Sequence, residues 1–105
     1  MKIGIIGTGY VGLVLGACLS ELGNNVICLD IDEKKIEDLK HGKIPIHEAG
    51  LTELVINNIK KERLHFVTSY EHTVHNSDII FICVGTPSSR ENNSPDMKYV
   101  GFRYN

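Results

Sequence analysis

Three glycines near the N-terminus are the part of the sequence with the clearest chemical use. Gly7, Gly9 and Gly12 follow a short apolar run and precede an aliphatic stretch, in the pattern G-x-G-x-x-G. At a strand-to-helix turn, Gly7 permits the tight bend, Gly9 lets the backbone approach a ligand without an intervening Cβ, and Gly12 lets the helix pack on the strand. The first N–H groups of such a helix lack partners within it and favour a phosphate. The turn therefore predicts a site for the pyrophosphate of a dinucleotide.

Asp30 supplies a second chemical group, at the end of the next apolar run and roughly 20 residues after the turn. Its carboxylate can accept hydrogen bonds from both hydroxyls of an adenine ribose but would repel a 2′-phosphate, which favours NAD over NADP. Lys34 and Lys35 leave two interpretations open: one of them pairs with a phosphate, or they belong to a solvated charged face. The glycines by themselves are also compatible with a simple tight turn, and Asp30 tips the prediction towards cofactor binding.

Apolar periodicity predicts the elements that position these groups. A strand at residues 2–6 enters the turn, a helix at residues 10–22 leaves it, a strand follows at residues 26–29, and Asp32 caps a helix at residues 33–40. The side chains expected to face the sheet recur at helical spacing. They are Val11, Val14, Leu15, Cys18, Leu19 and Leu22 in the first helix, and Ile36 and Leu39 in the second.

The second half of the chain continues the alternation of helices and strands. The expected elements are a helix at residues 51–61, a strand at residues 64–67, a short helix opened by a Thr68–Glu71 capping box and ending near His75, and a strand at residues 78–84. Right-handed crossovers between such strands give a parallel, doubly wound α/β sheet of the Rossmann type. We expect a half-domain with strand order 3-2-1-4, whose ligand-binding strand ends lie at Gly7 and Gly85.

Length and charge limit what the chain can be. Its 105 residues and net charge of −2 fit one domain with a modest core and no basic surface for nucleic acid. We expect a single domain over residues 1–105, with residues 88–105 as an exposed connection and an atypical end. No apolar run is long enough to cross a membrane, and the absence of a signal peptide predicts a cytoplasmic location.

The cysteines and histidines do not form a recognisable reactive or metal-binding pattern. Cys18, Cys28 and Cys83 are widely spaced among apolar neighbours, which predicts reduced core residues. A nucleophilic role for Cys83 is the less favoured alternative, because no neighbouring residue type would activate it. His72 and His75 have helical spacing but no third ligand, so we predict no metal site.

Several longer segments resemble the UDP-glucose/GDP-mannose dehydrogenase family, and within it the UDP-glucose 6-dehydrogenases most closely. They are GTGYVGLVLGACLSELG from residue 7, VICLDIDEKKIEDLKHGKIPIHEAGLTEL from residue 26, DIIFICVGTPSS from residue 78, and a polar link leading to Asp96 and Tyr99. The resemblance implies NAD contacts at Tyr10, Val11, Asp30, Lys35 and Thr86. From position alone, Thr86 is equally well a cap of its loop.

The resemblance also implies an activity and shows what this chain lacks for it. Members of the family oxidise the C6 alcohol of a nucleotide sugar to a carboxylate in two NAD-dependent steps, in pathways of polysaccharide biosynthesis, using a cysteine and a lysine that lie beyond residue 105. We therefore expect no catalytic residue here, NAD(H) binding without turnover, and binding of a nucleotide sugar only with the missing half. The alternative is a non-catalytic nucleotide-binding remnant or a regulatory, partner-binding module.

The C-terminal end departs from the family pattern. Residues 101–105 do not match the expected continuing helix, which suggests a truncated or frame-shifted end, and Ala49 stands where the family commonly has proline. Without a further strand beside it, the strand at residues 78–84 would expose an apolar edge. We expect self-association through that edge or marginal stability of the monomer.

Overall fold

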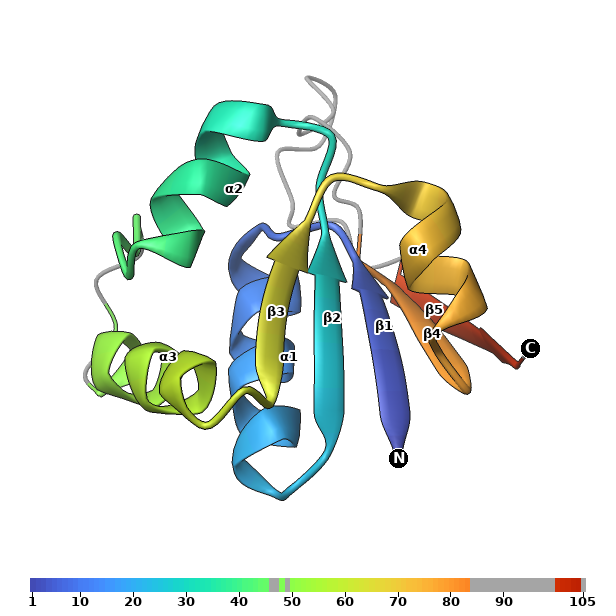
Figure 1. The fold of residues 1–105 in the computed structure, drawn as a ribbon, viewed down its shortest axis with the longest axis horizontal. Helices are drawn as coiled ribbons and strands as arrows, with labels where there is room; N and C mark the ends of the chain where they lie inside the picture. The colour runs from blue at the N-terminus through green and yellow to red at the C-terminus, as the bar shows by residue number, and fades with distance from the viewer. Residues whose placement is uncertain (46–47, 49, 84–99, 105) are drawn as a thin grey trace, which may run out of the picture.

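The computed structural model, which describes residues 1–45, 48, 50–83 and 100–104, is built around one twisted sheet (Figure 1). The strands are β1 (Lys2–Ile6), β2 (Asn25–Leu29), β3 (Leu64–Val67), β4 (Ile79–Cys83) and β5 (Val100–Tyr104), in the order β3-β2-β1-β4-β5. β1 to β4 pair in parallel, which confirms the predicted order 3-2-1-4. The predicted Rossmann-type α/β class is likewise confirmed.

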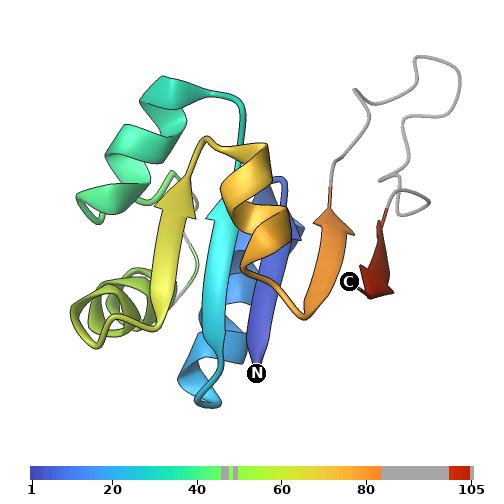
Figure 2. The same ribbon diagram turned by 45° about the vertical axis from the view of Figure 1, so that its right-hand side comes forward.

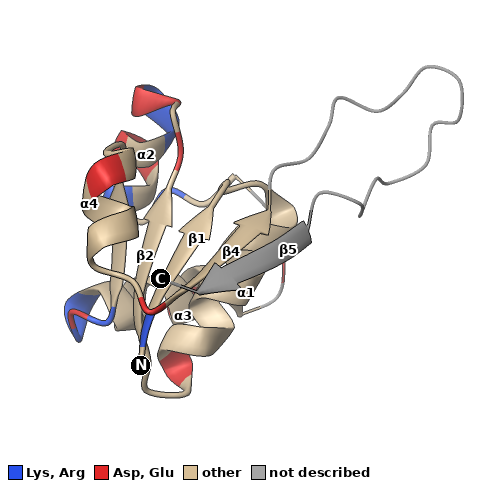
Figure 3. Ribbon diagram, turned by 90° about the vertical axis from the view of Figure 1, so that its right-hand side faces the viewer, with Lys and Arg blue, Asp and Glu red and all other residues tan. Residues whose placement is uncertain are grey.

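Helices cover both faces of the sheet, as the doubly wound prediction requires. They are α1 (Tyr10–Glu21), α2 (Glu33–Lys40), α3 (Leu51–Lys60) and α4 (Tyr70–His75). Figures 1 and 2 show α1 behind the sheet and α4 in front of it, with α3 packed beside α1. Charged residues lie mainly on the helices and connections, and Lys2 is the one charged residue in strands β1 to β4 (Figure 3). β1 lies between β2 and β4 in the sheet, and its pairing with both strands fixes the position of the glycine turn that follows it.

The face that α1 turns towards the sheet differs from the prediction. Its buried residues are Gly12, Leu13, Gly16, Ala17 and Ser20. Several of the large aliphatic residues expected there are only partly buried, and the side chain of Leu22 is exposed. The reason is close packing: a Cβ added at Gly16 would lie 2.8 Å from the Cys28 sulfur and 3.3 Å from Ile5 Cδ1. Small residues let α1 approach the sheet, and the larger ones flank that contact.

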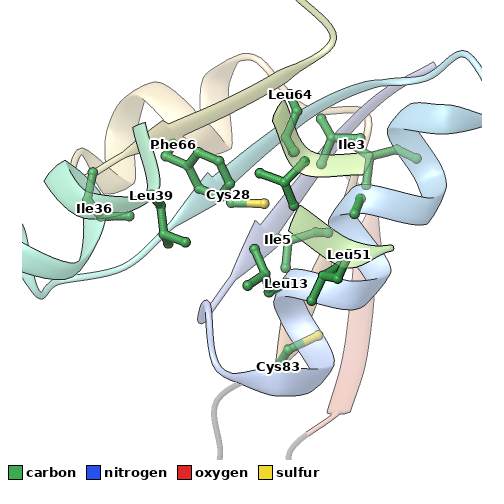
Figure 4. Close-up of a cluster of buried hydrophobic side chains, with 13 residues drawn as sticks. Ile3, Ile5, Leu13, Cys28, Ile36, Leu39, Leu51, Leu64, Phe66 and Cys83 are labelled. Carbon is green, nitrogen blue, oxygen red and sulfur yellow. The ribbon is translucent and has the colours of Figure 1, made fainter. Parts of the chain in front are cut away.

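The core lies between the sheet and the layer formed by α1, α2 and α3. Figure 4 shows Ile5, Leu13 and Cys28 at its centre, with Ile36 and Leu39 of α2 as predicted. Burying apolar surface of this kind stabilises a fold by roughly 25 cal/mol per Å².

Two of the three cysteines belong to this core. Burial raises the pKa of the Cys28 thiol to about 12, with a smaller effect from the nearby Cys83, whose own pKa burial also raises. The raised pKa disfavours the reactive thiolate of both residues, and their burial in the core agrees with the predicted packing role. The prediction was wrong for Cys18, which is exposed on α1.

The helix starts of α2 and α4 are capped by side chains. Asp32 accepts a hydrogen bond from the N–H of Lys35 at 3.1 Å, as predicted for the start of α2. At α4 the cap is Ser69, whose hydroxyl oxygen accepts from the N–H of His72 at 3.1 Å, so the predicted Thr68–Glu71 box was wrong by one residue. α4 ends at His75, as expected.

The edge of β4 is occupied, contrary to the prediction of an open edge. β5 pairs antiparallel with it, from Ile79 opposite Tyr104 to Cys83 opposite Val100. The signal for this strand is present in the sequence, because valine, phenylalanine and tyrosine alternate with other residues over positions 100–104. It was overlooked because the pairing is non-local and antiparallel.

The described residues include neither a membrane-spanning helix nor a cluster of metal-binding side chains. None of the helices described is long and apolar enough to cross a membrane. The same residues contain no group of three or more histidine, cysteine, aspartate or glutamate side chains placed to hold a metal ion.

Candidate functional site

The turn between β1 and α1 is shaped by two glycines that the protein itself requires. Gly7 has a φ of +102°, a conformation that other residues rarely adopt, and its N–H donates to the carbonyl of Leu29 at 2.8 Å. A Cβ added at Gly12 would collide with the carbonyl oxygen of Gly7. The roles predicted for Gly7 in the bend and Gly12 in close packing are therefore confirmed. Together they hold the start of α1 against the end of β1.

Gly9 is different, because the packing of the described residues does not require a glycine there. A Cβ at this position would have no atom of the described residues within 4 Å, apart from those of its own chain neighbours. Gly9 is the N-cap of α1, and no side chain of the described residues caps this helix start. The turn thus offers open space in front of backbone N–H donors at the positive end of a helix dipole. This is the arrangement that a phosphate group fits.

Tyr10 and Val11 form the first turn of α1. The Tyr10 side chain is half exposed, and its hydroxyl donates to Glu48 Oε2 at 3.2 Å. The charge of Glu48, then the hydrogen bond, raises the pKa of Tyr10. Val11 is partly buried and packs against the core. Tyr10 and Val11 therefore lie directly after the glycine turn. The hydrogen bond of the Tyr10 hydroxyl connects the start of α1 to Glu48, in the segment before α3.

Asp30 lies directly after β2 and reaches the glycine turn through Thr8. Asp30 Oδ2 accepts hydrogen bonds from the Thr8 hydroxyl at 2.6 Å and from the Thr8 N–H at 3.1 Å. Its other oxygen, Oδ1, accepts from the N–H of Asp32 at 3.1 Å. Burial alone would raise the pKa of Asp30, but these hydrogen bonds, with a contribution from Lys35, outweigh it and lower the pKa overall. The carboxylate is therefore ionised at neutral pH and stands next to the glycine turn.

The two neighbouring lysines have different surroundings. Lys35 Nζ lies 3.7 Å from Asp30 Oδ2, with both side chains mostly buried. Lys34 is exposed and contacts Asp38 on the same helix at 3.8 Å. The structure brings Lys35 into the site and leaves Lys34 on the solvated face. A groove of about 550 Å³ opens beside the two lysines. Its lining consists of Asp32, Lys34, Lys35, Asp38, Lys43, Ile44 and Pro45.

Two further residues bear on the site: Thr86, which was predicted, and Thr8, which was not. Thr86 lies outside the described residues. Thr8 was missed, because the G-x-G-x-x-G pattern assigns no role to its second position. The only sequence signal for it is a hydroxyl residue at that position in a chain that also carries an aspartate at the end of the next strand.

Comparisons with known proteins agree with this geometry. The NAD-binding domain of the UDP-glucose/GDP-mannose dehydrogenase family matches residues 1–102. The UDP-glucose 6-dehydrogenase TuaD of Bacillus subtilis is 52% identical over 99 residues, which are 94% of this chain and 21% of that protein. The UDP-glucose 6-dehydrogenase of Rhizobium meliloti is 50% identical over 100 residues, which are 95% of this chain and 23% of that protein.

Solved structures show the same similarity in three dimensions. A GDP-mannose dehydrogenase from Pseudomonas aeruginosa, solved as a ternary complex, superposes with a TM-score of 0.82 at 43% identity, covering 94% of this chain and 22% of that one. A UDP-glucose dehydrogenase from Pyrobaculum islandicum gives a TM-score of 0.79 at 35% identity, covering 93% and 22%. The chain thus spans roughly a fifth of the length of these relatives. It belongs to the UDP-glucose/GDP-mannose dehydrogenase family, whose NAD-binding domain it matches along nearly its whole length.

Proposed function

We propose that this chain is the NAD-binding part of a UDP-glucose 6-dehydrogenase-like oxidoreductase, which oxidises the C6 alcohol of a nucleotide sugar to the carboxylate. The observation that carries the proposal is an uncapped helix start with open space at Gly9, next to the ionised carboxylate of Asp30. The relatives that match this chain are named for that activity. The nucleotide sugar and the catalytic groups belong to the part of those relatives that this chain does not cover.

The proposal gives each site residue a task. The backbone of Gly7, Gly9 and Gly12, with the N–H groups of Tyr10 and Val11, would hold the pyrophosphate, because this helix start has no side-chain cap among the described residues. Thr86 would contact the cofactor from the other side of the strand switch point. When bound, NAD supplies the hydride acceptor of the reaction.

Asp30 and Lys35 would bind the adenine ribose. The ionised Asp30 accepts hydrogen bonds from the ribose hydroxyls and repels a 2′-phosphate, so the proposal includes a preference for NAD over NADP. Lys35 reduces the net negative charge at the ribose site, because its ammonium group already pairs with Asp30 Oδ2. A cytoplasmic location and a part in polysaccharide biosynthesis follow from the same proposal, by analogy with the family.

Titration calorimetry with NADH tests the binding part of the proposal. The wild-type chain should bind NADH saturably, and Asp30→Ala should weaken binding by about 10- to 100-fold, the effect of losing hydrogen bonds to a charged group. Glu37→Ala is the matched control, since it removes an exposed carboxylate from α2 that does not line the groove, and it should leave the affinity unchanged. Absence of saturable binding, or equal affinities for Asp30→Ala and wild type, would overturn the assignment.

A chimera tests the proposed activity. This chain would replace the matching segment of the Bacillus subtilis UDP-glucose 6-dehydrogenase TuaD, and formation of NADH would be followed with UDP-glucose as substrate. The chimera should be active, and Asp30→Ala should raise its KM for NAD more than it lowers kcat. A correctly folded chimera that binds NADH without turnover would instead favour the non-catalytic module.

A further inference from the structure

Thr8 is the residue of the turn for which neither the motif nor the proposed function provides a role. Its side chain is fully buried, at 0% exposure, although it carries a hydroxyl group. The hydroxyl donates to Asp30 Oδ2 at 2.6 Å, and the backbone N–H of the same residue donates to the same oxygen at 3.1 Å. Thr8 in the glycine turn therefore holds the Asp30 carboxylate, at the end of β2, by two hydrogen bonds.

These hydrogen bonds give the two carboxylate oxygens of Asp30 different surroundings. Oδ2 receives both bonds from Thr8 and also faces Lys35 Nζ at 3.7 Å. Oδ1 receives one hydrogen bond from the described residues, from the N–H of Asp32. A carboxylate oxygen accepts about two hydrogen bonds. Oδ2 is therefore filled by the protein, and Oδ1 keeps capacity for a further donor.

We propose that Thr8 is a positioning residue for cofactor recognition: its hydroxyl fixes the Asp30 carboxylate so that Oδ1 is presented to a hydroxyl of the adenine ribose. This inference rests on the proposed function, since it concerns how the same site binds NAD. Thr8 acts through Asp30 and does not itself need to touch the cofactor. It contributes to affinity by ordering the acceptor before the ligand arrives.

The surroundings explain why a hydroxyl is needed at this position. Lys35 competes for Oδ2, and without the Thr8 hydroxyl only the backbone N–H of Thr8 would hold this oxygen at the glycine turn against the pull of the ammonium group. The hydrogen bond from Thr8 is short and ends on a charged acceptor, which makes it one of the stronger kinds in proteins. Threonine is also restricted at χ1, which narrows the directions that its hydroxyl can take.

Thr8→Val is the decisive variant, because valine keeps the shape and the backbone N–H bond but removes the hydroxyl. We expect NADH binding to weaken about 10-fold in calorimetry, the effect of one lost hydrogen bond to a charged group. Thr8→Ser restores the donor and should stay within about 2-fold of wild type. Should Thr8→Val fail to fold, as judged by circular dichroism, Thr8→Ala removes the hydroxyl without facing a methyl group to the carboxylate, and the same loss is expected.

A double-mutant cycle separates positioning from a general effect on the fold. If Thr8 acts through Asp30, Thr8→Val should have no further effect on NADH affinity in an Asp30→Ala background. A similar weakening in both backgrounds, or wild-type affinity in Thr8→Val, would overturn this inference while leaving NAD binding by the chain intact. Failure of the wild-type chain to bind NADH would instead overturn the proposed function.

Discussion

The starts of α1 and α2 lie at the same edge of the sheet but are built in opposite ways. At α2, Asp32 accepts a hydrogen bond from the N–H of Lys35, so the helix supplies its own acceptor. At α1, the N-cap is Gly9, and the described residues offer no side-chain acceptor to the first N–H groups. One helix start is capped by a side chain, and the other has no side-chain cap among the described residues.

Folding energy does not explain this difference. Glycine at an N-cap is only a few tenths of a kcal/mol less favourable than serine, asparagine or aspartate. Gly9 has φ of −70° and ψ of −167°, an extended conformation open to any residue, and in the described part of the chain an added Cβ would meet no atom within 4 Å beyond its chain neighbours. What distinguishes Gly9 is the access that it gives to the backbone N–H groups at the start of α1.

Gly9→Asp should have the largest effect, because it gives α1 the kind of start that α2 has. The new carboxylate would accept from the free N–H groups and occupy the space of a phosphate with like charge. NADH affinity should fall by roughly 100-fold, or about 3 kcal/mol, in calorimetry, while the melting temperature stays equal or rises slightly. Gly9→Ala, which adds only a methyl group, should show a smaller loss. Unchanged affinity in Gly9→Asp would mean that the pyrophosphate is not held at this helix start.

Gly12→Ala should reverse the pattern and affect the fold first. Its Cβ would collide with the carbonyl oxygen of Gly7, so the turn or α1 must move. We expect a loss of about 1–3 kcal/mol in the free energy of unfolding, measured by urea denaturation. Gly9→Ala is the matched control and should unfold within about 0.5 kcal/mol of wild type. Equal stability of the two variants would contradict the packing role of Gly12.

Much of this site was predictable, because local rules determine it. The bend at Gly7, the packing at Gly12 and the cap at Asp32 depend on residues close in sequence and on steric rules that hold in every protein. The order of β1 to β4 follows from right-handed crossovers and the alternation of apolar runs. Such features need no knowledge of distant contacts.

The missed features depend on contacts between distant segments. The hydroxyl of Thr8 has meaning only when Asp30, on another strand end, is beside it. The buried face of α1 was mispredicted because hydrophobicity points to large residues, whereas the sheet selects the small ones at Gly16 and Ala17. β5 was missed because its partner, β4, precedes it by a long connection and runs antiparallel to it.

Asp32→Ala should show what the cap of α2 contributes. Removing its carboxylate leaves the N–H of Lys35 without the side-chain acceptor, and we expect a loss of about 1 kcal/mol in the free energy of unfolding. NADH affinity should stay within about 2-fold of wild type, because Asp32 holds Asp30 through its backbone N–H, which the substitution keeps. A large loss of affinity at unchanged stability would show that the two helix starts do not have separate tasks.

The smallest effect concerns acid pH and the carboxylate between the two helix starts. The hydrogen bonds from Thr8 and Asp32, with the charge of Lys35, lower the pKa of Asp30 in the folded chain against the opposing effect of burial. A lowered folded pKa contributes stability that is fully present above the unfolded value of about 3.9 and is lost as the pH falls through the folded value. The difference in unfolding free energy between wild type and Asp30→Asn should therefore be constant near neutral pH and shift against the wild type in acid. Urea denaturation of both chains from neutral to acid pH measures this difference in unfolding free energy. A difference that does not change with pH would show that the hydrogen bonds from Thr8 to Asp30 do not favour the ionised carboxylate.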